Sequence, residues 1–315
     1  MDLSQLYDPS LDEYVPEALD FLSKFSFDSM VNDLSTPEGL TRARDLESLG
    51  GDLVSFASVE DVDVRTYVGA VGDELELRIF APDGPARAVY LDIHGGGFFM
   101  GHPRMGDRRN RDMADTHQIA VVSAQYRLAP EHPWPAGPDD CETAALWVLG
   151  PGRDEFGSVP LLIGGGSAGA NLAATTLVRL RDRHDAAAEF IGANLVFGVF
   201  DLSGTPSQIK LGNTGFRDLY VGDHDTEARK NPDISPLYAD LNHLCPALFT
   251  VGTYDYLYDD SLFMAARWRA GDNPAELAVY PASPHGFTVF PTKMTQAAND
   301  RTDAWLAQIL ESADS

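Results

Sequence analysis

Short apolar runs of strand length recur through most of this chain, and segments of helical length separate them. The strand-like runs cover residues 87–93, 119–126, 159–165, 193–200, 246–252 and 275–281. The helical segments cover residues 105–117, 139–149, 168–184, 259–270 and 294–311. Strands buried on both faces are apolar throughout, and strands that alternate with helices form parallel sheets. The pattern predicts the α/β class, with a mostly parallel central sheet, helices on both faces and an antiparallel edge at residues 62–80.

Length and composition fit one large domain and exclude several classes of partner. The chain has 315 residues, of which 44% are hydrophobic, so it can bury a large core. Its formal net charge of −25 would repel nucleic acid and anionic membrane surfaces. No apolar run approaches the ~20 residues of a transmembrane helix, and the acidic N-terminus does not resemble a signal peptide. Because Cys141 and Cys245 fit reduced core residues better than a disulfide or a metal cluster, we expect a cytoplasmic location and no metal.

A glycine-rich stretch, PLLIGGGSAGAN at residues 160–171, joins a strand-like run to a helical segment. The phosphate-binding P-loop requires a lysine that this stretch lacks. The dinucleotide fingerprint fits residues 164–169, but that motif belongs after the first strand of its unit, whereas this stretch lies in mid-chain. The template G-x-S-x-G fits residues 165–169 in the strand-to-helix context that it requires. Ser167 is therefore the candidate nucleophile, held in a strained turn.

A second glycine motif, HGGGF at residues 94–98, directly follows another strand-like run. Glycines in this position allow backbone N–H groups to face a cavity in which a developing oxyanion can bind. By itself the motif is also compatible with a tight turn beside a buried histidine. Its combination with a G-x-S-x-G motif further along the chain favours the oxyanion interpretation.

A histidine and an aspartate follow the last two strand-like runs. His285 lies in SPHGF after the run at 275–281, and Asp255 lies directly after the run at 246–252. His285 can act as the base for the serine, and Asp255 can orient its imidazole. Asp259 and Asp260 are weaker candidates, because they begin a helical segment, where acidic residues complement the helix dipole. The order serine, aspartate, histidine is that of the α/β-hydrolases.

Together these residues resemble the hormone-sensitive-lipase-like branch of the α/β-hydrolases, which includes many bacterial carboxylesterases. The resemblance extends from about residue 60 to the end of the chain. Besides HGGGF and GGSAGAN, it rests on YRLAPEHPWPA at 126–136, DISPLYA at 233–239, GTYDYLYDD at 252–260 and HGF at 285–287. Several motifs in the order of the family make the resemblance specific.

The resemblance implies a catalytic domain with the α/β-hydrolase fold, formed by residues 46–200 and 233–315. A helical cap over the active site would be formed by residues 1–45 together with the insertion at residues 201–232. The resemblance also implies that no metal or organic cofactor is needed. Monomers and homodimers both occur in the family, and the sequence does not decide between them.

Within the two glycine motifs, the resemblance assigns the oxyanion donors to the N–H groups of Gly96, Gly97 and Ala168. Two positions of the elbow depart from the family pattern, which is G-D-S-A-G-G. Gly166 stands where relatives place the aspartate, and Ala170 stands where they place the last glycine. Since neither change removes a catalytic group, we expect the chemistry to be retained with altered local hydrogen bonding.

The proline-rich motif at residues 126–136 also has a physical interpretation. Its three prolines stiffen a loop that follows a buried strand. Glu131 and His132 are adjacent and of opposite charge type, so we expect them to form a charged pair that braces the elbow. A structural role is favoured over a catalytic one.

These features predict a serine carboxylesterase that hydrolyses short- to medium-chain esters through an acyl-enzyme intermediate. Phe98 and Phe99, beside the oxyanion loop, are candidates for the substrate pocket, although such aromatic pairs equally fit a core. An amidase-type relative, such as an arylformamidase or a metabolite deacetylase, would use the same triad. A non-catalytic receptor, like the plant gibberellin receptors of this family, is disfavoured because those receptors lack the triad histidine, whereas His285 is present here.

Overall fold

One mixed sheet forms the centre of the molecule, as the sequence predicts. The computed structural model describes residues 6–24, 34, 36–45, 59, 62–69, 74–211 and 215–313. Its eight described strands are β1 (Asp63–Val68), β2 (Glu74–Phe80), β3 (Val89–Ile93), β4 (Ala120–Gln125), β5 (Leu161–Gly166), β6 (Phe190–Val196), β7 (Ala247–Gly252) and β8 (Ala275–Tyr280). Their order in the sheet is β1-β2-β4-β3-β5-β6-β7-β8. β2 is antiparallel to β1 and to β4, and the remaining pairs are parallel, which confirms the predicted antiparallel edge.

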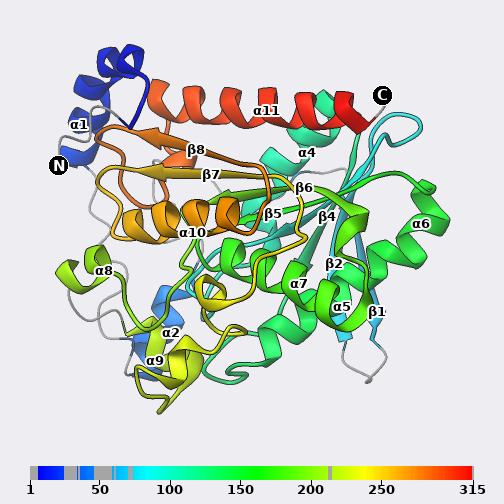
Figure 1. Cartoon of the computed structure of the whole chain (residues 1–315), viewed down its shortest axis with the longest axis horizontal. Coiled ribbons are helices and arrows are strands. Elements are labelled where there is room, and N and C mark those ends of the chain that lie inside the picture. Colours follow the sequence, from blue (N-terminus) through cyan, green and yellow to red (C-terminus); the bar gives the residue numbers. More distant parts are fainter. Residues whose placement is uncertain are drawn as a thin grey trace.

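Helices cover both faces of this sheet (Figure 1). The described α-helices are α1 (Val15–Lys24), α2 (Pro37–Ala43), α4 (Asp107–His117), α5 (Ala136–Leu149), α6 (Pro151–Phe156), α7 (Ala168–His184), α8 (Pro206–Leu211), α9 (Phe216–Val221), α10 (Tyr258–Ala270) and α11 (Lys293–Ala313). Side chains of α5, α7 and α10 share one apolar cluster with the sheet, whereas side chains of α4 and α11 pack in a second cluster. Alternate residues of β3 and β5 enter the two clusters, so these strands are buried on both faces.

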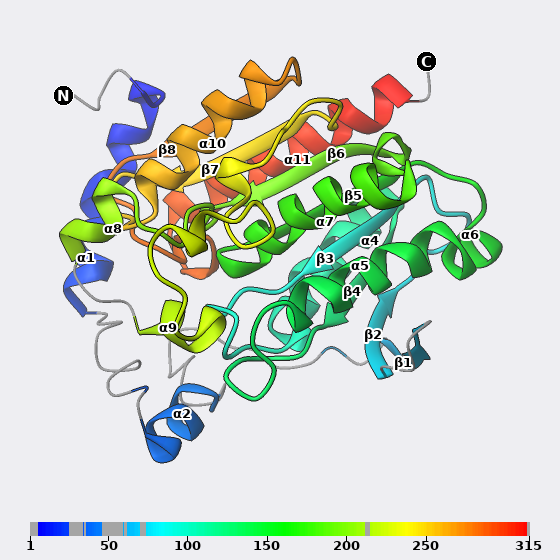
Figure 2. The same ribbon diagram turned by 60° about the horizontal axis from the view of Figure 1, so that its bottom comes forward.

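The carboxyl ends of the parallel strands meet at one edge of the sheet. HGGGF follows β3, Ser167 follows β5, Asp255 follows β7, and His285 follows β8. Both views place α1, α2, α8 and α9 at the end of the molecule toward which the arrowheads of β7 and β8 point (Figures 1 and 2). Within the segments predicted to form a cap, residues 1–5, 25–33, 35 and 212–214 lie outside the described residues.

No helix in the described ranges combines the length and the apolar composition needed to cross a membrane. The longest, α11, has 21 residues and carries several charged side chains along its length. It packs its apolar side, including Trp305, Leu306 and Leu310, against the sheet. Its burial is therefore that of a helix covering one face of an α/β core.

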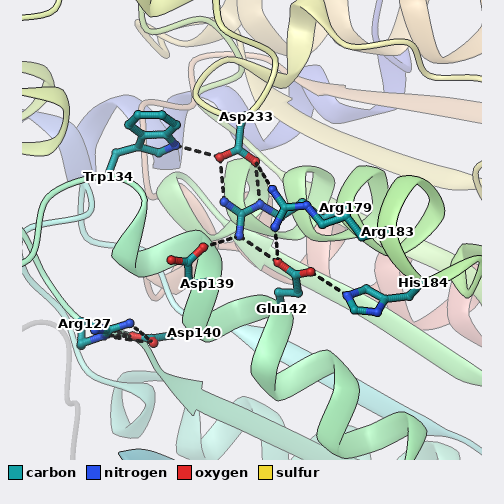
Figure 3. A network of polar contacts seen from close by, with 9 residues as sticks. All are labelled: Arg127, Trp134, Asp139, Asp140, Glu142, Arg179, Arg183, His184 and Asp233. Carbon is teal, nitrogen blue, oxygen red and sulfur yellow. Dashed lines mark hydrogen bonds and ion pairs between the residues drawn. The ribbon is translucent and has the colours of Figure 1, made fainter. Parts of the chain in front are cut away.

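A network of polar contacts around a buried guanidinium joins the two motif segments of residues 126–136 and 233–239 (Figure 3). Arg179, on α7, has a side chain that is 4% exposed, and its Nε and Nη2 donate to Asp233 at 2.6 and 2.7 Å. The same carboxylate accepts from Nε1 of Trp134 at 2.9 Å. The remaining partners of the guanidinium are two carboxylates of α5, Asp139 at 2.7 Å and Glu142 at 3.0 Å. This network fixes the segment directly after the insertion at 201–232 to α7, the helix that follows Ser167.

Candidate active site

Ser167 occupies a sharp turn between β5 and α7. Its backbone angles are φ 57° and ψ −118°, a conformation that non-glycine residues rarely adopt. Its N–H donates to the carbonyl oxygen of Val196 at 2.8 Å, which ties the turn to the end of β6. The strained turn lifts the side chain out of the sheet at its carboxyl edge, where it can reach a substrate.

Two glycines of the elbow allow backbone to pack directly on backbone. A Cβ atom on Gly165 would lie 2.3 Å from the carbonyl oxygen of Ile93, and one on Gly169 would lie 2.0 Å from the same atom. Such distances are far below van der Waals contact, so no side chain fits at either position. The elbow is thereby pressed against the end of β3, from which the HGGGF loop departs.

The three predicted triad residues lie in one chain of hydrogen bonds. Nε2 of His285 is 2.9 Å from Oγ of Ser167. Nδ1 of His285 is 3.1 and 3.0 Å from the two carboxylate oxygens of Asp255. The Asp255 carboxylate is fully buried and also accepts the N–H of Leu257 at 2.8 Å. This is the relative geometry that a serine nucleophile, a base and an orienting carboxylate require.

Two aromatic rings hold the imidazole of His285. Phe197 meets it edge-on, with ring centroids 4.9 Å apart, and Tyr256 meets it with centroids also 4.9 Å apart. A Cβ atom on Gly166 would lie 3.3 Å from Cε2 of Phe197, tighter than ordinary contact. The absence of a side chain at Gly166 therefore leaves room for the ring that packs on the histidine. Sequence reasoning missed both aromatic residues, although Tyr256 directly follows Asp255.

The predicted oxyanion donors lie in the HGGGF loop and at the start of α7, next to Ser167. Gly96 and Gly97 have φ values of 118° and 58°, and their N–H groups have no acceptor within the described residues. Ala168 begins α7, and the first N–H groups of a helix lack partners inside it. A Cβ on the preceding Gly95 would lie 2.8 Å from the carbonyl oxygen of Gly166, so the loop touches the elbow. The HGGGF loop and the start of α7 can therefore offer backbone donors beside Ser167.

His94, the first residue of the loop motif, has a structural position. Burial lowers its pKa to about 4, so the ring is neutral at physiological pH. The ring stacks on Tyr126 with centroids 4.2 Å apart, and the Tyr126 hydroxyl donates to the carbonyl oxygen of His94 at 3.2 Å. These contacts fix the start of the HGGGF loop to Tyr126.

Phe98 and Phe99, the predicted pocket residues, are buried in the interior. Phe98 stacks face to face on Tyr220 of α9, with centroids 3.8 Å apart and planes 7° apart. The ring of Phe99 lies against Gly97, where an added Cβ would meet it at 2.9 Å. The positions match the core interpretation of this pair, and the Phe98 ring connects the HGGGF loop to α9.

The expected pair of Glu131 with His132 is wrong. Both carboxylate oxygens of Glu131 instead accept from the guanidinium of Arg44, at 2.8 and 2.6 Å. The Arg44 side chain also donates to the carbonyl oxygens of Phe99 and Ala129, each at 2.7 Å. An arginine can bridge several acceptors with its planar fork, whereas a neighbouring histidine offers one donor at a time. The proline-rich loop is thus braced by the N-terminal segment.

A metal site needs several histidine, cysteine or carboxylate side chains close together. Nowhere in the described part of the chain do three or more histidine, cysteine, aspartate or glutamate side chains group so that they could hold a metal ion. The polar groups around Ser167 are the imidazole, the carboxylate and the backbone N–H groups described above.

Comparison with known proteins gives consistent matches. Residues 90–289 match the family model of the α/β hydrolase fold. The carboxylic ester hydrolase LipN of Mycobacterium tuberculosis is 32% identical over 243 residues, which cover 72% of this chain and 64% of LipN. The esterase LipI of the same organism is 28% identical over 321 residues, covering 96% of this chain and 98% of LipI. A solved structure, the hyperthermophilic esterase from the archaeon Pyrobaculum calidifontis, matches with a TM-score of 0.77 and 28% identity over 86% of this chain and 93% of its own.

Proposed function

The chain belongs to the α/β-hydrolase family, in its hormone-sensitive-lipase-like branch, and on that premise we propose that it is a serine carboxylesterase. The observation that carries the proposal is the hydrogen-bonded chain from Asp255 through His285 to Ser167 at the carboxyl edge of the sheet. Relatives that are carboxylic ester hydrolases support the same activity. The substrates are small esters with short to medium acyl chains.

The reaction begins when Oγ of Ser167 attacks the ester carbonyl carbon. Nε2 of His285 accepts the hydroxyl proton as the new bond forms, over the 2.9 Å that separates the two atoms. The Asp255 carboxylate accepts the Nδ1–H of the imidazole, which keeps Nε2 free as the base and stabilises the imidazolium that results. Burial of that carboxylate strengthens its interaction with the ring.

The tetrahedral intermediate carries its negative charge on the former carbonyl oxygen. The N–H groups of Gly96, Gly97 and Ala168 bind this oxyanion, and such preorganised donors act on charge that develops only in the transition state. The imidazolium of His285 then protonates the departing alcohol, which leaves an acyl group on Ser167. Water attacks the acyl-enzyme with His285 again as base, and the carboxylic acid is released.

The helices at the carboxyl edge form a cap in this proposal. α1 and α2 belong to residues 1–45, and α8 and α9 belong to the insertion at 201–232. Their common position beyond the ends of β7 and β8 supports this assignment (Figure 2). A cap of this kind sets the shape of the substrate pocket and separates the bound ester from bulk solvent.

The cellular location proposed for this enzyme is the cytoplasm. Cys141 and Cys245 are both buried and free, with no disulfide between them. Burial raises the pKa of each thiol, which favours the protonated, unreactive form. Two such thiols are typical of proteins kept in a reducing compartment.

Replacement of Ser167 by alanine tests the proposed function. We expect Ser167→Ala to lower kcat on 4-nitrophenyl esters by roughly four orders of magnitude, because the variant has no nucleophile while its backbone donors remain. A fluorophosphonate probe should label the wild type on Ser167 and should leave Ser167→Ala unlabelled, as seen by mass spectrometry of the intact protein.

The matched control is Ser158→Ala, since Ser158 is an exposed serine just before β5. It should keep wild-type turnover and labelling. Near-normal ester turnover by Ser167→Ala, or labelling at another serine, would contradict the assignment.

A further inference from the structure

Arg217, on α9 in the insertion, is a half-buried arginine with few protein partners. Within the described residues its one hydrogen bond is from Nη1 to Oε1 of Gln208, at 3.3 Å, and no carboxylate lies within ion-pair distance. Arg229 in the same insertion, by contrast, donates to the Asp218 carboxylate at 2.6 Å. A guanidinium carries five N–H donors, so most of those on Arg217 are not used by the protein.

The helix that carries Arg217 rests on the oxyanion loop. A Cβ on Gly97 would lie 3.4 Å from the Cβ of Phe216, the neighbour of Arg217 in the chain. Tyr220, later in the same helix, stacks on Phe98, and its carbonyl oxygen accepts the N–H of Trp134 at 2.9 Å. α9 is therefore fixed directly beside the corner in which the ester carbonyl is bound.

The guanidinium of Arg217 lies close to the segment that follows β6 and acts electrostatically on a neighbour of His285. Its Nη1 would be 3.2 Å from a Cβ on Gly204, in the segment that follows β6. Burial raises the pKa of Tyr256, and the positive charge of Arg217 acts against that rise, so the two side chains are within electrostatic range. The Tyr256 ring in turn contacts the ring of His285. Arg217 therefore lies close to Gly204 and within electrostatic range of the tyrosine whose ring contacts His285.

The charge of Arg217 is only partly balanced by its surroundings. Burial, followed by the nearby charge of Arg229, lowers the pKa of Arg217, whereas the carboxylates of Asp218, Asp201 and Asp260 act in the opposite direction from beyond ion-pair distance. The chain as a whole is strongly acidic, with a net charge of −25, and repels anions at long range. Selective binding of an anion near Ser167 would therefore depend on a local cation, and the guanidinium fork matches a carboxylate in two parallel hydrogen bonds.

We propose that Arg217 binds a carboxylate on the substrate, so that the enzyme selects esters that carry a free carboxylate away from the scissile bond. The proposal rests on the proposed function, since it names the substrate class of the same site. It makes Arg217 a specificity-determining residue, which contributes to the binding of one class of ester and takes no part in the chemistry at Ser167.

The test compares esters that differ in one charge. In the first pair the anionic ester is mono-4-nitrophenyl adipate, with its carboxylate on the acyl side, and the neutral ester is 4-nitrophenyl hexanoate. In the second pair the anionic ester is 4-acetoxybenzoate, with its carboxylate on the alcohol side, and the neutral ester is 4-methylphenyl acetate. We expect the wild type to prefer the anionic member of at least one pair, and Arg217→Gln to lower kcat/KM for that ester by about 10- to 100-fold, chiefly through KM.

Three controls separate this result from a general defect. Arg217→Gln should change kcat/KM for the neutral esters by less than about threefold, which also shows that the variant is folded. Arg217→Lys should recover part of the preference, because it restores the charge without the fork. Arg229→Gln removes a paired arginine of the same insertion and should leave the ratio of anionic to neutral turnover unchanged.

The outcomes distinguish this proposal from the proposed function. A wild type that hydrolyses neutral esters but shows no preference for either anionic ester overturns the role of Arg217 and leaves the esterase assignment intact. The same holds if Arg217→Gln and Arg217→Lys lower anionic and neutral turnover equally. Failure of the wild type to hydrolyse any of the four esters contradicts the proposed function itself.

Discussion

The elbow around Ser167 and the insertion around α9 both contain glycines, but the surroundings of these glycines are opposite. A Cβ on Gly169, in the elbow, would lie 2.0 Å from the carbonyl oxygen of Ile93 and 2.8 Å from that of His94. At Gly215, directly before α9, no atom of the described residues lies within 4 Å of the added atom, and φ is −52°. Among the described residues, one region is packed backbone on backbone, whereas the other has free space at this glycine.

This difference indicates how the two regions serve the same reaction. The elbow holds the proposed nucleophile against the loop of the proposed backbone donors with little tolerance, because small displacements at reacting atoms are costly. In the proposed function the insertion surrounds the substrate, and it can change its side chains without moving the reacting atoms. On this proposal, close packing sets the chemistry, and the more open part of the fold sets the choice of substrate.

The largest effect is expected from adding one methyl group to the packed region. Gly169→Ala forces the end of β3 and the start of α7 apart, which displaces Ser167 relative to the oxyanion loop. We expect kcat/KM on a 4-nitrophenyl ester to fall by about 100-fold or more. The free energy of unfolding should fall by about 1–3 kcal/mol, as measured by denaturant titration.

Gly215→Ala is the matched change in the open region. Its backbone angles are acceptable to alanine, and the methyl group meets no neighbour, so stability should stay within about 0.5 kcal/mol of the wild type. Equal losses in the two variants would show that the contrast in packing does not control tolerance.

A smaller effect on catalysis, with a clear effect on stability, is expected where the two regions are joined. Arg179→Met removes the guanidinium that holds Asp233, directly after the insertion, and Glu142 on α5. Glu142 keeps Arg183 and His184 as partners, but the partly buried Asp233 keeps only Arg183, at 3.9 Å. Because Asp233 loses both of its short ion-pair contacts, the free energy of unfolding should fall by about 3 kcal/mol. Ester turnover per folded molecule at 25 °C should change by less than about tenfold, since no triad contact is lost.

The neighbouring Arg183 provides the control for this network. It contacts the same Glu142 carboxylate at 2.7 Å, but its side chain is 48% exposed (Figure 3). Arg183→Met should therefore cost less than about 1 kcal/mol in chemical denaturation. A larger loss from Arg183→Met than from Arg179→Met would refute the argument from burial.

The strands and the order of site residues were predictable because they depend on local patterns. Apolar runs of strand length correspond to buried strands of the sheet, and the alternation with helices fixes which strand ends meet. The G-x-S-x-G and HGGG motifs, with Asp255 and His285 after later strands, are then brought to one edge by topology alone. The family matches confirm the predicted fold class.

Long-range side-chain pairing was not predictable in the same way. Glu131 has an adjacent histidine in the sequence, yet its partner is Arg44, 87 residues away. The side chain at Phe197, which uses the space at Gly166 to reach His285, lies 31 residues beyond the elbow in sequence (197 against 166). No local periodicity encodes such contacts, because they arise only when loops from different strands meet.

The two regions also differ in how their stability should depend on pH, which requires no change in activity to detect. Burial lowers the pKa of His94, under the oxyanion loop, to about 4 from 6.5, so the fold favours the neutral ring and loses stability as pH falls through this range. Burial raises the pKa of Asp260 from 3.8 to about 7. Hydrogen bonds from Gln208 and Thr205 of the insertion lower this pKa, but burial has the larger effect. The fold then holds that proton more tightly than the unfolded chain, so this contribution is lost as pH rises from about 4 to 7.

Asp260→Asn removes this second contribution, because the amide does not titrate. Relative to the wild type, the variant should therefore gain stability with rising pH by at most about 1.4 kcal/mol per unit between pH 4 and 7, with no further change above that range. Thr205→Val removes a donor to Asp260 at 2.6 Å, which raises the pKa further and should extend the wild-type loss to higher pH. Denaturant unfolding at a series of pH values measures both slopes. A constant difference between Asp260→Asn and the wild type from pH 4 to 7 would mean that Asp260 is ionised throughout, held by its four donors as a permanent anion beneath the insertion.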